Sequence, residues 1–328
     1  MKLVKQISLL LALVLTFGLF NMCMYRVFTV RLGNNFSDAT QLKMVDVKNF
    51  LPFNENSDLV KIETELKLSG ELPVLDGAAA LVPVYASVIN SLYPESSVTF
   101  EGGVFSDDNF YGENFAPDSK MQYKNTVRGY KAVTDGETDI FLSAAPSAQQ
   151  KKYAEDKGVE LTYVPIGLEA FVFFVNKSNP VDNLTADQIR QIYAGNIKNW
   201  KDVGGTDRII NPILRIEGSG SQSAMDSFMK DVPYGQKSLL APLGGSLGFS
   251  FRYYLDGMVD NSDVKMLSLN GIYPSPENIR NGTYPVIAKF YAIYRADNKN
   301  ENIPLIIDWL LSEEGQSLIE QTGYISIS

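Results

Sequence analysis

Short apolar runs alternate with amphipathic stretches from residue 72 to the end of the chain. Runs of four to eight apolar residues are typical of strands, and apolar positions three or four apart indicate helices. Strands are predicted at 73–75, 98–101, 139–143, 160–164, 170–175, 213–216 and 285–294, with a turn at Asp76-Gly77. Helices are predicted at 78–92, 128–134, 147–157, 184–193, 221–229 and 303–311, the last continuing through 314–322. This alternation predicts an α/β fold with largely parallel sheets.

The N-terminus carries a basic and then apolar pattern that is typical of targeting segments. Lys2 and Lys5 precede the almost wholly apolar stretch 7–24. Phe20-Asn21-Met22 is too bulky for a usual cleavage site, which favours a retained membrane anchor over a cleaved signal or a lipoprotein. Residues 1–31 are therefore predicted to be a signal peptide or anchor, and the remaining chain is expected to be extracytoplasmic and membrane-associated. Residues 32–71 are expected to form a stalk and lead-in, with 50–53 docking on the body.

Composition excludes several classes of chemistry. The 328 residues are 45% hydrophobic, which is enough for a large core and more than one lobe. Histidine is absent, and the one cysteine is Cys23, so a catalytic triad, a histidine zinc site and an intramolecular disulfide are all excluded. The net charge is −9, and the acidic body argues against nucleic-acid binding. We expect no cofactor, no metal site and no catalytic residue.

One glycine-rich stretch is suited to holding a small anion. Residues 215–225 read RIEGSGSQSAM, with a predicted strand before and a predicted helix after. Gly218 and Gly220 allow close approach of backbone amides, and the first turn of a helix directs free N–H groups and a positive dipole end at a ligand. Ser219 and Ser221 add hydroxyl donors.

Two charged residues complete this motif. The Arg215 guanidinium is a fork of donors that suits a tetrahedral oxyanion. Glu217 could orient Arg215, or accept a proton from a partly protonated ligand. The stretch lacks the Gly-Lys-Ser/Thr of a P-loop and the Gly-x-Ser-x-Gly of a hydrolase, and it only nearly matches a dinucleotide fingerprint. An ordinary helix cap on a Gly-Ser turn remains the alternative interpretation.

Four ordered segments together resemble the phosphate-binding proteins of bacterial ABC importers. The stretch 215–221 resembles that family's Arg-x-Asp/Glu-Gly-Ser-Gly-Thr/Ser signature, and 76–85 (DGAAALVPVY) resembles its first-loop pattern. The segment 185–200 (TADQIRQIYAGNIKNW) and the closing stretch 314–324 also resemble family segments. The similarity spans roughly residues 72–328.

The resemblance implies the two-lobed α/β fold of periplasmic binding proteins (type II) with a two-strand hinge, preceded by the N-terminal hydrophobic segment. It places the crossings near 165–171 and 284–290, so that lobe I comprises 72–166 plus 288–328 and lobe II comprises 167–287. Carried over by position, the ligand-binding residues are Ala79, Ala80, Thr126, Arg215, Ser219, Gly220 and Ser221.

Two positions depart from the family pattern. Ala79 replaces a residue that usually carries a hydroxyl, so only its amide remains as a donor. Ala144 stands where the family has an aspartate that accepts the proton of phosphate, and its loss is expected to relax selectivity against sulfate. Ser143, Glu169 or Glu217 could serve as the acceptor instead, although a hinge salt bridge is an equally good interpretation of Glu169. Arg252 could lie near the ligand, but an arginine there is more often solvated.

These observations predict a binding protein that captures inorganic phosphate, or a close oxyanion, for an ABC permease. We expect a monomer that is held at the membrane by its N-terminus. The alternative is a membrane-tethered anion sensor or a non-transport binding scaffold, which the two alanines and the unusual anchor favour. An enzyme would need Ser219 or Ser227 as a nucleophile without an ordinary base.

Overall fold

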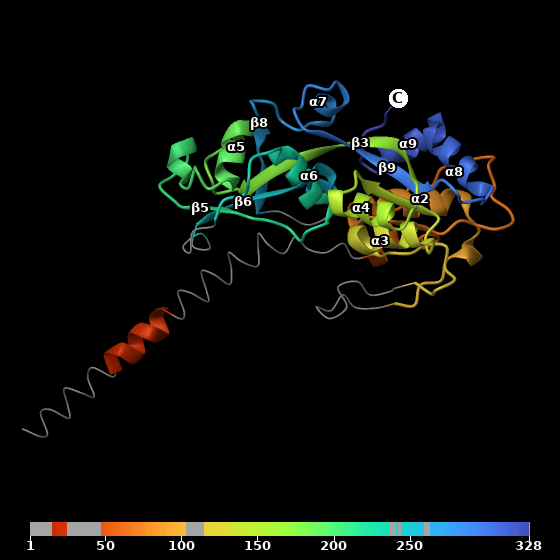
Figure 1. Cartoon of the computed structure of the whole chain (residues 1–328), viewed down its shortest axis with the longest axis horizontal. Helices are drawn as coiled ribbons and strands as arrows, with labels where there is room; N and C mark the ends of the chain where they lie inside the picture. The colour runs from red at the N-terminus through yellow and green to blue at the C-terminus, as the bar shows by residue number, and fades with distance from the viewer. Residues whose placement is uncertain are drawn as a thin grey trace, which may run out of the picture.

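The computed structural model describes residues 15–24, 47–102, 115–236, 241, 244–258 and 263–327. Residues 15–24 form an exposed helix at the start of the chain (Figure 1). Within the described ranges, no helix has both the length and the apolar character needed to cross a bilayer. The rest of the predicted targeting segment, 1–14 and 25–31, lies outside the described residues, as does the first part of the predicted lead-in.

A mixed seven-stranded sheet lies at the centre of the described part of the chain. Its order is β1-β2-β9-β3-β6-β5, and β7 also pairs with β3. The strands are β1 (Leu75–Gly77), β2 (Ile140–Ala144), β3 (Leu161–Asn176), β5 (Ile210–Pro212), β6 (Gly245–Phe251), β7 (Val264–Met266) and β9 (Ile287–Arg295). A separate parallel pair joins β4 (Asn183–Leu184) to β8 (Ser268–Leu269). The prediction of largely parallel sheets is wrong, because β9 is antiparallel to β2 and β3, and β3 is antiparallel to β6 and β7.

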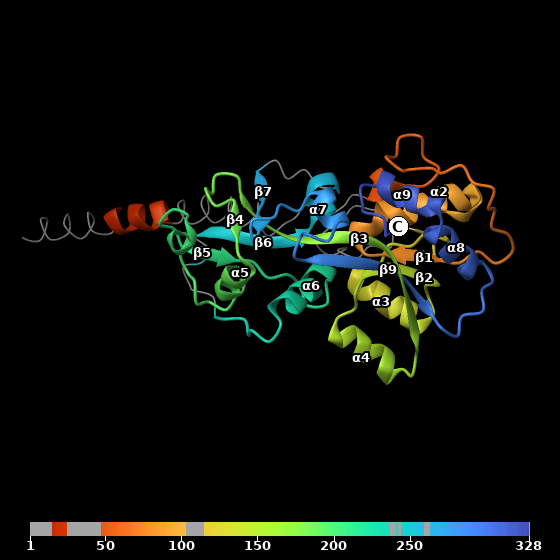
Figure 2. The same cartoon turned by 90° about the horizontal axis from the view of Figure 1, so that it is seen from above.

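The two longest strands join two lobes, as Figure 2 shows. The first half of β3 pairs with β9, and its second half pairs with β6 and β7. We call the side with β1 and β2 and the helices within 79–156 and 302–321 lobe I. The side with β4 to β8 and the helices within 186–229 is lobe II. Because the chain passes between the lobes along β3 and returns along β9, these strands must run in opposite directions. The predicted strands 160–164 and 170–175 are thus one continuous strand.

Helices cover both faces of the lobe I sheet. In Figure 2, α2, α8 and α9 lie on one face, and α3 and α4 lie on the other. The α-helices are α2 (Val82–Leu92), α3 (Asn125–Asp135), α4 (Ala148–Asp156), α5 (Ala186–Tyr193), α6 (Gly220–Met229), α7 (Pro276–Arg280), α8 (Asn302–Leu311) and α9 (Glu313–Gln321). The shorter turns are 3-10 helices η1 (Val47–Phe50), η2 (Ala79–Leu81), η3 (Glu95–Ser97) and η5 (Trp200–Val203), and the π-helix η7 (Tyr254–Met258).

Helix starts follow their capping residues. Thr185 accepts from the Gln188 amide in a capping box, as expected for a threonine before α5. Ser147 caps α4 in the same way. Ser312 accepts from the Gly315 amide and starts α9 as a separate helix, so the prediction that α8 continues through residue 322 is wrong.

Three local predictions are wrong. Asp76-Gly77 is not a turn but part of β1, and Gly77 is needed because a Cβ there would lie 2.6 Å from the Tyr85 ring. Residues 213–216 are irregular, since their apolar side chains do not share one buried face, and β5 ends before them. At 98–101 only an isolated bridge forms, between Phe100 and Phe115.

The described part of the lead-in, 47–71, packs along lobe I. Phe50 is buried in the core, as the apolar cluster 50–53 indicated. The Val60 amide donates to the Ser87 hydroxyl at 3.1 Å, so the segment is tied to α2 by its backbone as well as by apolar contacts.

Candidate anion-binding site

A cavity of about 130 Å³ lies between the lobes, with walls from both lobes and from β3 and β9. One water molecule needs only roughly 10–15 Å³ of such space, so a tetrahedral anion has room. The lining contains all seven residues carried over as ligand-binding positions, namely Ala79, Ala80, Thr126, Arg215, Ser219, Gly220 and Ser221. Residues that lie up to 142 positions apart in the chain, from Ala79 to Ser221, thus meet around one space.

The N-terminus of α6 forms one wall of this cavity. Ser219 is the N-cap, and its Oγ accepts from the Gln222 amide at 3.2 Å, which leaves the hydroxyl hydrogen free to donate. The amides of Gly220 and Ser221 belong to the first turn and have no acceptor within the helix. Gly218 has φ of +79°, a left-handed conformation that turns the chain into α6. Together these groups are donors beside the positive end of a helix dipole.

Arg215 supplies a full positive charge, in addition to the partial charge of the helix dipole. Its side chain is half-buried and lines the cavity, and burial lowers the pKa of its guanidinium, which nevertheless stays charged. No carboxylate among the described residues forms an ion pair with it. The backbone amide of Arg215 donates to Gln222 Oε1 at 2.9 Å, so α6 fixes the position of this residue. A charged donor that is partly desolvated and lacks an acidic partner is well suited to an anion.

A second helix N-terminus faces the cavity from lobe I. Asn125, Thr126 and Val127 at the start of α3 all belong to the lining. A Cβ built at Gly220 would lie 3.8 Å from Thr126 Oγ1, so the first turns of α3 and α6 face each other closely. The helix predicted at 128–134 begins earlier, at Asn125, and its N-cap Lys124 makes no side-chain cap bond.

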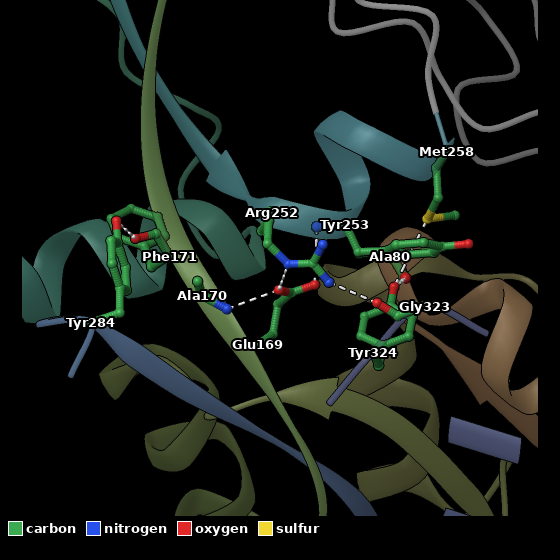
Figure 3. A network of polar contacts seen from close by, with 10 residues as sticks. All are labelled: Ala80, Glu169, Ala170, Phe171, Arg252, Tyr253, Met258, Tyr284, Gly323 and Tyr324. Carbon is green, nitrogen blue, oxygen red and sulfur yellow. Dashed lines mark hydrogen bonds and ion pairs between the residues drawn. The ribbon is translucent and has the colours of Figure 1, made fainter. Parts of the chain in front are cut away.

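Glu169 takes part in a buried network beside the cavity, shown in Figure 3. Its Oε1 lies 3.4 Å from Arg252 Nε, an ion pair too long for a strong hydrogen bond, and it also accepts from the Ala170 amide at 2.8 Å. Its Oε2 accepts from the Tyr253 amide at 3.1 Å. Arg252 donates to the Gly323 carbonyl at 2.7 Å, and its side chain is buried, so the expectation of a solvated arginine is wrong.

Burial of Glu169 has an electrostatic consequence. Loss of hydration raises the pKa of Glu169 to about 7, although Arg252 and the two backbone amides oppose this rise. Glu169 also lines the cavity. Glu169 thus forms the hinge ion pair with Arg252 and also belongs to the residues that line the cavity.

The other two candidate acceptors lie outside the lining. Glu217 is exposed, and it forms no described ion pair with Arg215, so neither role considered for it is supported by a contact. Ser143 is fully buried, and its Oγ has no hydrogen-bond partner among the described residues. Ala144, the position at which the resemblance expects an aspartate, does belong to the residues that line the cavity.

Sequence reasoning missed Asn125, Ser250 and Lys289 as lining residues. Lys289 is exposed and adds a second cation at the cavity. A lysine within the otherwise apolar stretch 287–293 was the signal that could have drawn attention to it. In the part of the chain that is described, no group of three or more acidic, cysteine or histidine side chains is arranged to hold a metal ion.

The fold and this cavity define a class: two-lobed α/β solute-binding proteins that enclose a ligand between their lobes. The sequence matches the family described as PBP superfamily domain over residues 108–314, and the protein belongs to that family.

Named relatives agree with this assignment. The chain is 26% identical to Protein SphX of Synechococcus elongatus, with 78% of this chain and 86% of that protein covered. It is also 26% identical to the phosphate-binding protein PstS of Bacillus subtilis, with 83% and 85% covered. Among solved structures, it is similar to a Clostridium perfringens protein with bound phosphate, provisionally assigned as a phosphate ABC transporter substrate-binding protein. That match has a TM-score of 0.56 and 26% identity, and covers 78% of this chain and 99% of the other.

Proposed function

We propose that this protein binds inorganic phosphate, or a closely similar oxyanion, between its lobes outside the cytoplasm and delivers it to an ABC permease. The observation that carries the proposal is the convergence on one cavity of the α3 and α6 N-termini and of the Arg215 guanidinium, which forms no ion pair with any described carboxylate. The names of the Bacillus subtilis and Clostridium perfringens relatives support phosphate as the ligand.

Binding proceeds by closure of the lobes around a dehydrated anion. Lobe I is proposed to comprise 72–166 plus 288–328, and lobe II 167–287, with β3 and β9 as the hinge. The anion's charge is met by Arg215 and by neutral donors, among them the Ser219 hydroxyl and the amides of α6. Closure excludes water and strengthens each of these interactions.

The proposed activity is binding without turnover. The cavity offers donors, while Glu169, its buried carboxyl group, is engaged by Arg252 and two backbone amides. We further propose a monomer that is attached to the membrane through residues 1–31 and presents its lobes to the permease.

Calorimetric titration of the purified protein with phosphate and then sulfate tests the proposal. Arg215→Ala should abolish most binding, whereas Arg280→Ala should leave it unchanged, because Arg280 is exposed and pairs with Glu320 away from the cavity. Wild-type affinity in Arg215→Ala would contradict the assigned site. Absence of binding of both anions in the wild type would leave a different solute, or a sensor that no longer binds, as the better account.

A further inference from the structure

The side chain of Asn125 accepts hydrogen bonds from donors that the ligand was expected to use. Its Oδ1 accepts from the Thr126 amide at 2.7 Å and lies 3.4 Å from both the Thr126 hydroxyl and the Ala79 amide. Ala79 and Thr126 are the lobe I residues that the family resemblance assigns to the anion. A carboxamide oxygen thus stands among these donors within the cavity lining.

The orientation of this carboxamide is fixed by its neighbours. A backbone N–H can only donate, so the group that faces the amides of Ala79 and Thr126 must be the acceptor, Oδ1, and not the Nδ2 amine. Oδ1 therefore satisfies N–H groups beside the start of α3 that otherwise lack a described partner.

The backbone at Asn125 is unusual as well. Its φ is +60°, in the left-handed region that glycine adopts freely and that asparagine tolerates better than most residues. A glycine at this position would keep the backbone and remove only the carboxamide. The side chain is therefore not required for the local conformation.

We propose that the Asn125 carboxamide oxygen is a built-in substitute for one oxygen of the ligand, and that its displacement sets the affinity and the charge selectivity of the site. This inference rests on the proposed function. A neutral solute gains little when its own uncharged acceptor takes the place of Asn125 Oδ1, which is also uncharged. An anion exchanges neutral hydrogen bonds for charge-assisted ones, which are roughly twice as strong. Asn125 thus weakens the binding of all ligands and penalises uncharged ones most.

Two substitutions at one position test this exchange. Asn125→Gly should bind phosphate and sulfate roughly tenfold more tightly, because about one hydrogen bond no longer has to be displaced. Asn125→Asp places a carboxylate on the same donors and should weaken both anions at least about tenfold. Asn270→Gly is the matched control, since Asn270 also has positive φ (53°) and accepts from a backbone amide, that of Ala186, outside the cavity lining.

Calorimetry on the full chain gives the affinities, and a crystal structure with phosphate gives the geometry. The proposal is supported if Asn125→Gly binds more tightly than wild type, or binds where wild type does not, while Asn270→Gly matches wild type. In the phosphate complex, an anion oxygen should then replace Oδ1 at the Thr126 amide.

Binding in wild type together with equal or weaker binding in Asn125→Gly overturns the inference and leaves the proposed function standing, with Asn125 as an ordinary donor through Nδ2. Oδ1 still on the Thr126 amide beside bound phosphate overturns it equally. Absence of binding in all variants and in wild type overturns the proposed function, and this inference with it.

Discussion

Gln150 of α4 and Gly218 of the glycine-rich loop join the two lobes directly. The Gln150 Nε2 donates to the Gly218 carbonyl at 3.1 Å. The Oε1 of the same side chain accepts from the Ser147 amide at 2.8 Å and completes the capping box of α4. One carboxamide therefore serves a helix cap in lobe I and a contact to lobe II at the same time.

Gln150→Glu should weaken closure without harming α4. Glutamate keeps the acceptor for the Ser147 amide and is equally good in a capping box. It replaces the donor with a carboxylate oxygen that repels the Gly218 carbonyl. We expect anion dissociation to become roughly five- to tenfold faster, since one interlobe hydrogen bond is worth about 1 kcal/mol. Stopped-flow release measurements check this.

Gln188→Glu is the control for this substitution. Gln188 completes an equivalent capping box with Thr185 at α5 and makes no described contact to lobe I. Its release rate should equal that of wild type, and both variants should keep the wild-type melting temperature. Equal release rates in both variants would show that the contact between Gln150 and Gly218 does not control opening.

Ser219→Gly separates the two roles of the Ser219 hydroxyl. Glycine at an N-cap costs only a few tenths of a kcal/mol relative to serine, so the stability of α6 should change little. The ligand loses one hydroxyl donor, and affinity should fall roughly fivefold, the scale of about 1 kcal/mol. Titration calorimetry and thermal unfolding on the same sample distinguish these effects. Unchanged affinity would show that the hydroxyl acts only as the cap.

How much of this site the sequence predicted depends on the range of the interactions. The stretch 215–221 could be interpreted locally, because glycine, serine and a following amphipathic run determine a loop and a helix start within a few residues. The contact between Asn125 and Ala79 spans 46 positions, and that between Tyr253 and Glu169 spans 84. No local pattern encodes such contacts, so Asn125 was missed and Arg252 was expected to be solvated.

The fold shows the same division. The capped helices α4 and α5 were predicted within two residues at each end, whereas the short helix α7, which Ser275 caps, was missed. Strand direction was not, because it depends on the path of the chain between the lobes along β3 and β9. Residues 213–216 were misassigned because an apolar run of that length does not reveal whether its residues share one face.

The raised pKa of Glu169 predicts a pH dependence of stability. Its pKa rises from 4.5 in an unburied carboxyl to about 7, so between these values the folded state holds the proton more tightly than the unfolded state. This contribution favours folding below about pH 4.5 and is lost as the pH rises through about 7. Asp76, with a pKa raised to about 6 by burial, contributes with the same sign.

Glu169→Gln removes one of these two titrations. Between about pH 4.5 and about pH 7, the free energy of unfolding of wild type should fall further than that of this variant. The difference between the two decreases should be on the order of 3 kcal/mol for a shift of this size. Asp76 is unchanged in both proteins, so the difference isolates Glu169. Urea unfolding at several pH values measures it, with the exposed Glu63→Gln as control. Parallel curves for wild type and Glu169→Gln would contradict the assigned protonation.

Ala144→Asp should narrow the range of anions that the site accepts. Ala144 lines the cavity from the end of β2, so a carboxylate there would face the ligand. Phosphate can keep a proton and donate it to this carboxylate, whereas sulfate has none and would meet an uncompensated negative charge. We expect sulfate affinity to fall at least about tenfold relative to phosphate affinity, as measured by competition calorimetry at neutral pH. Ala144→Asn has nearly the same volume without the charge and should discriminate less. If Ala144→Asp and Ala144→Asn shift the two affinities equally, the effect is steric, and the absence of a carboxylate at position 144 does not determine selectivity.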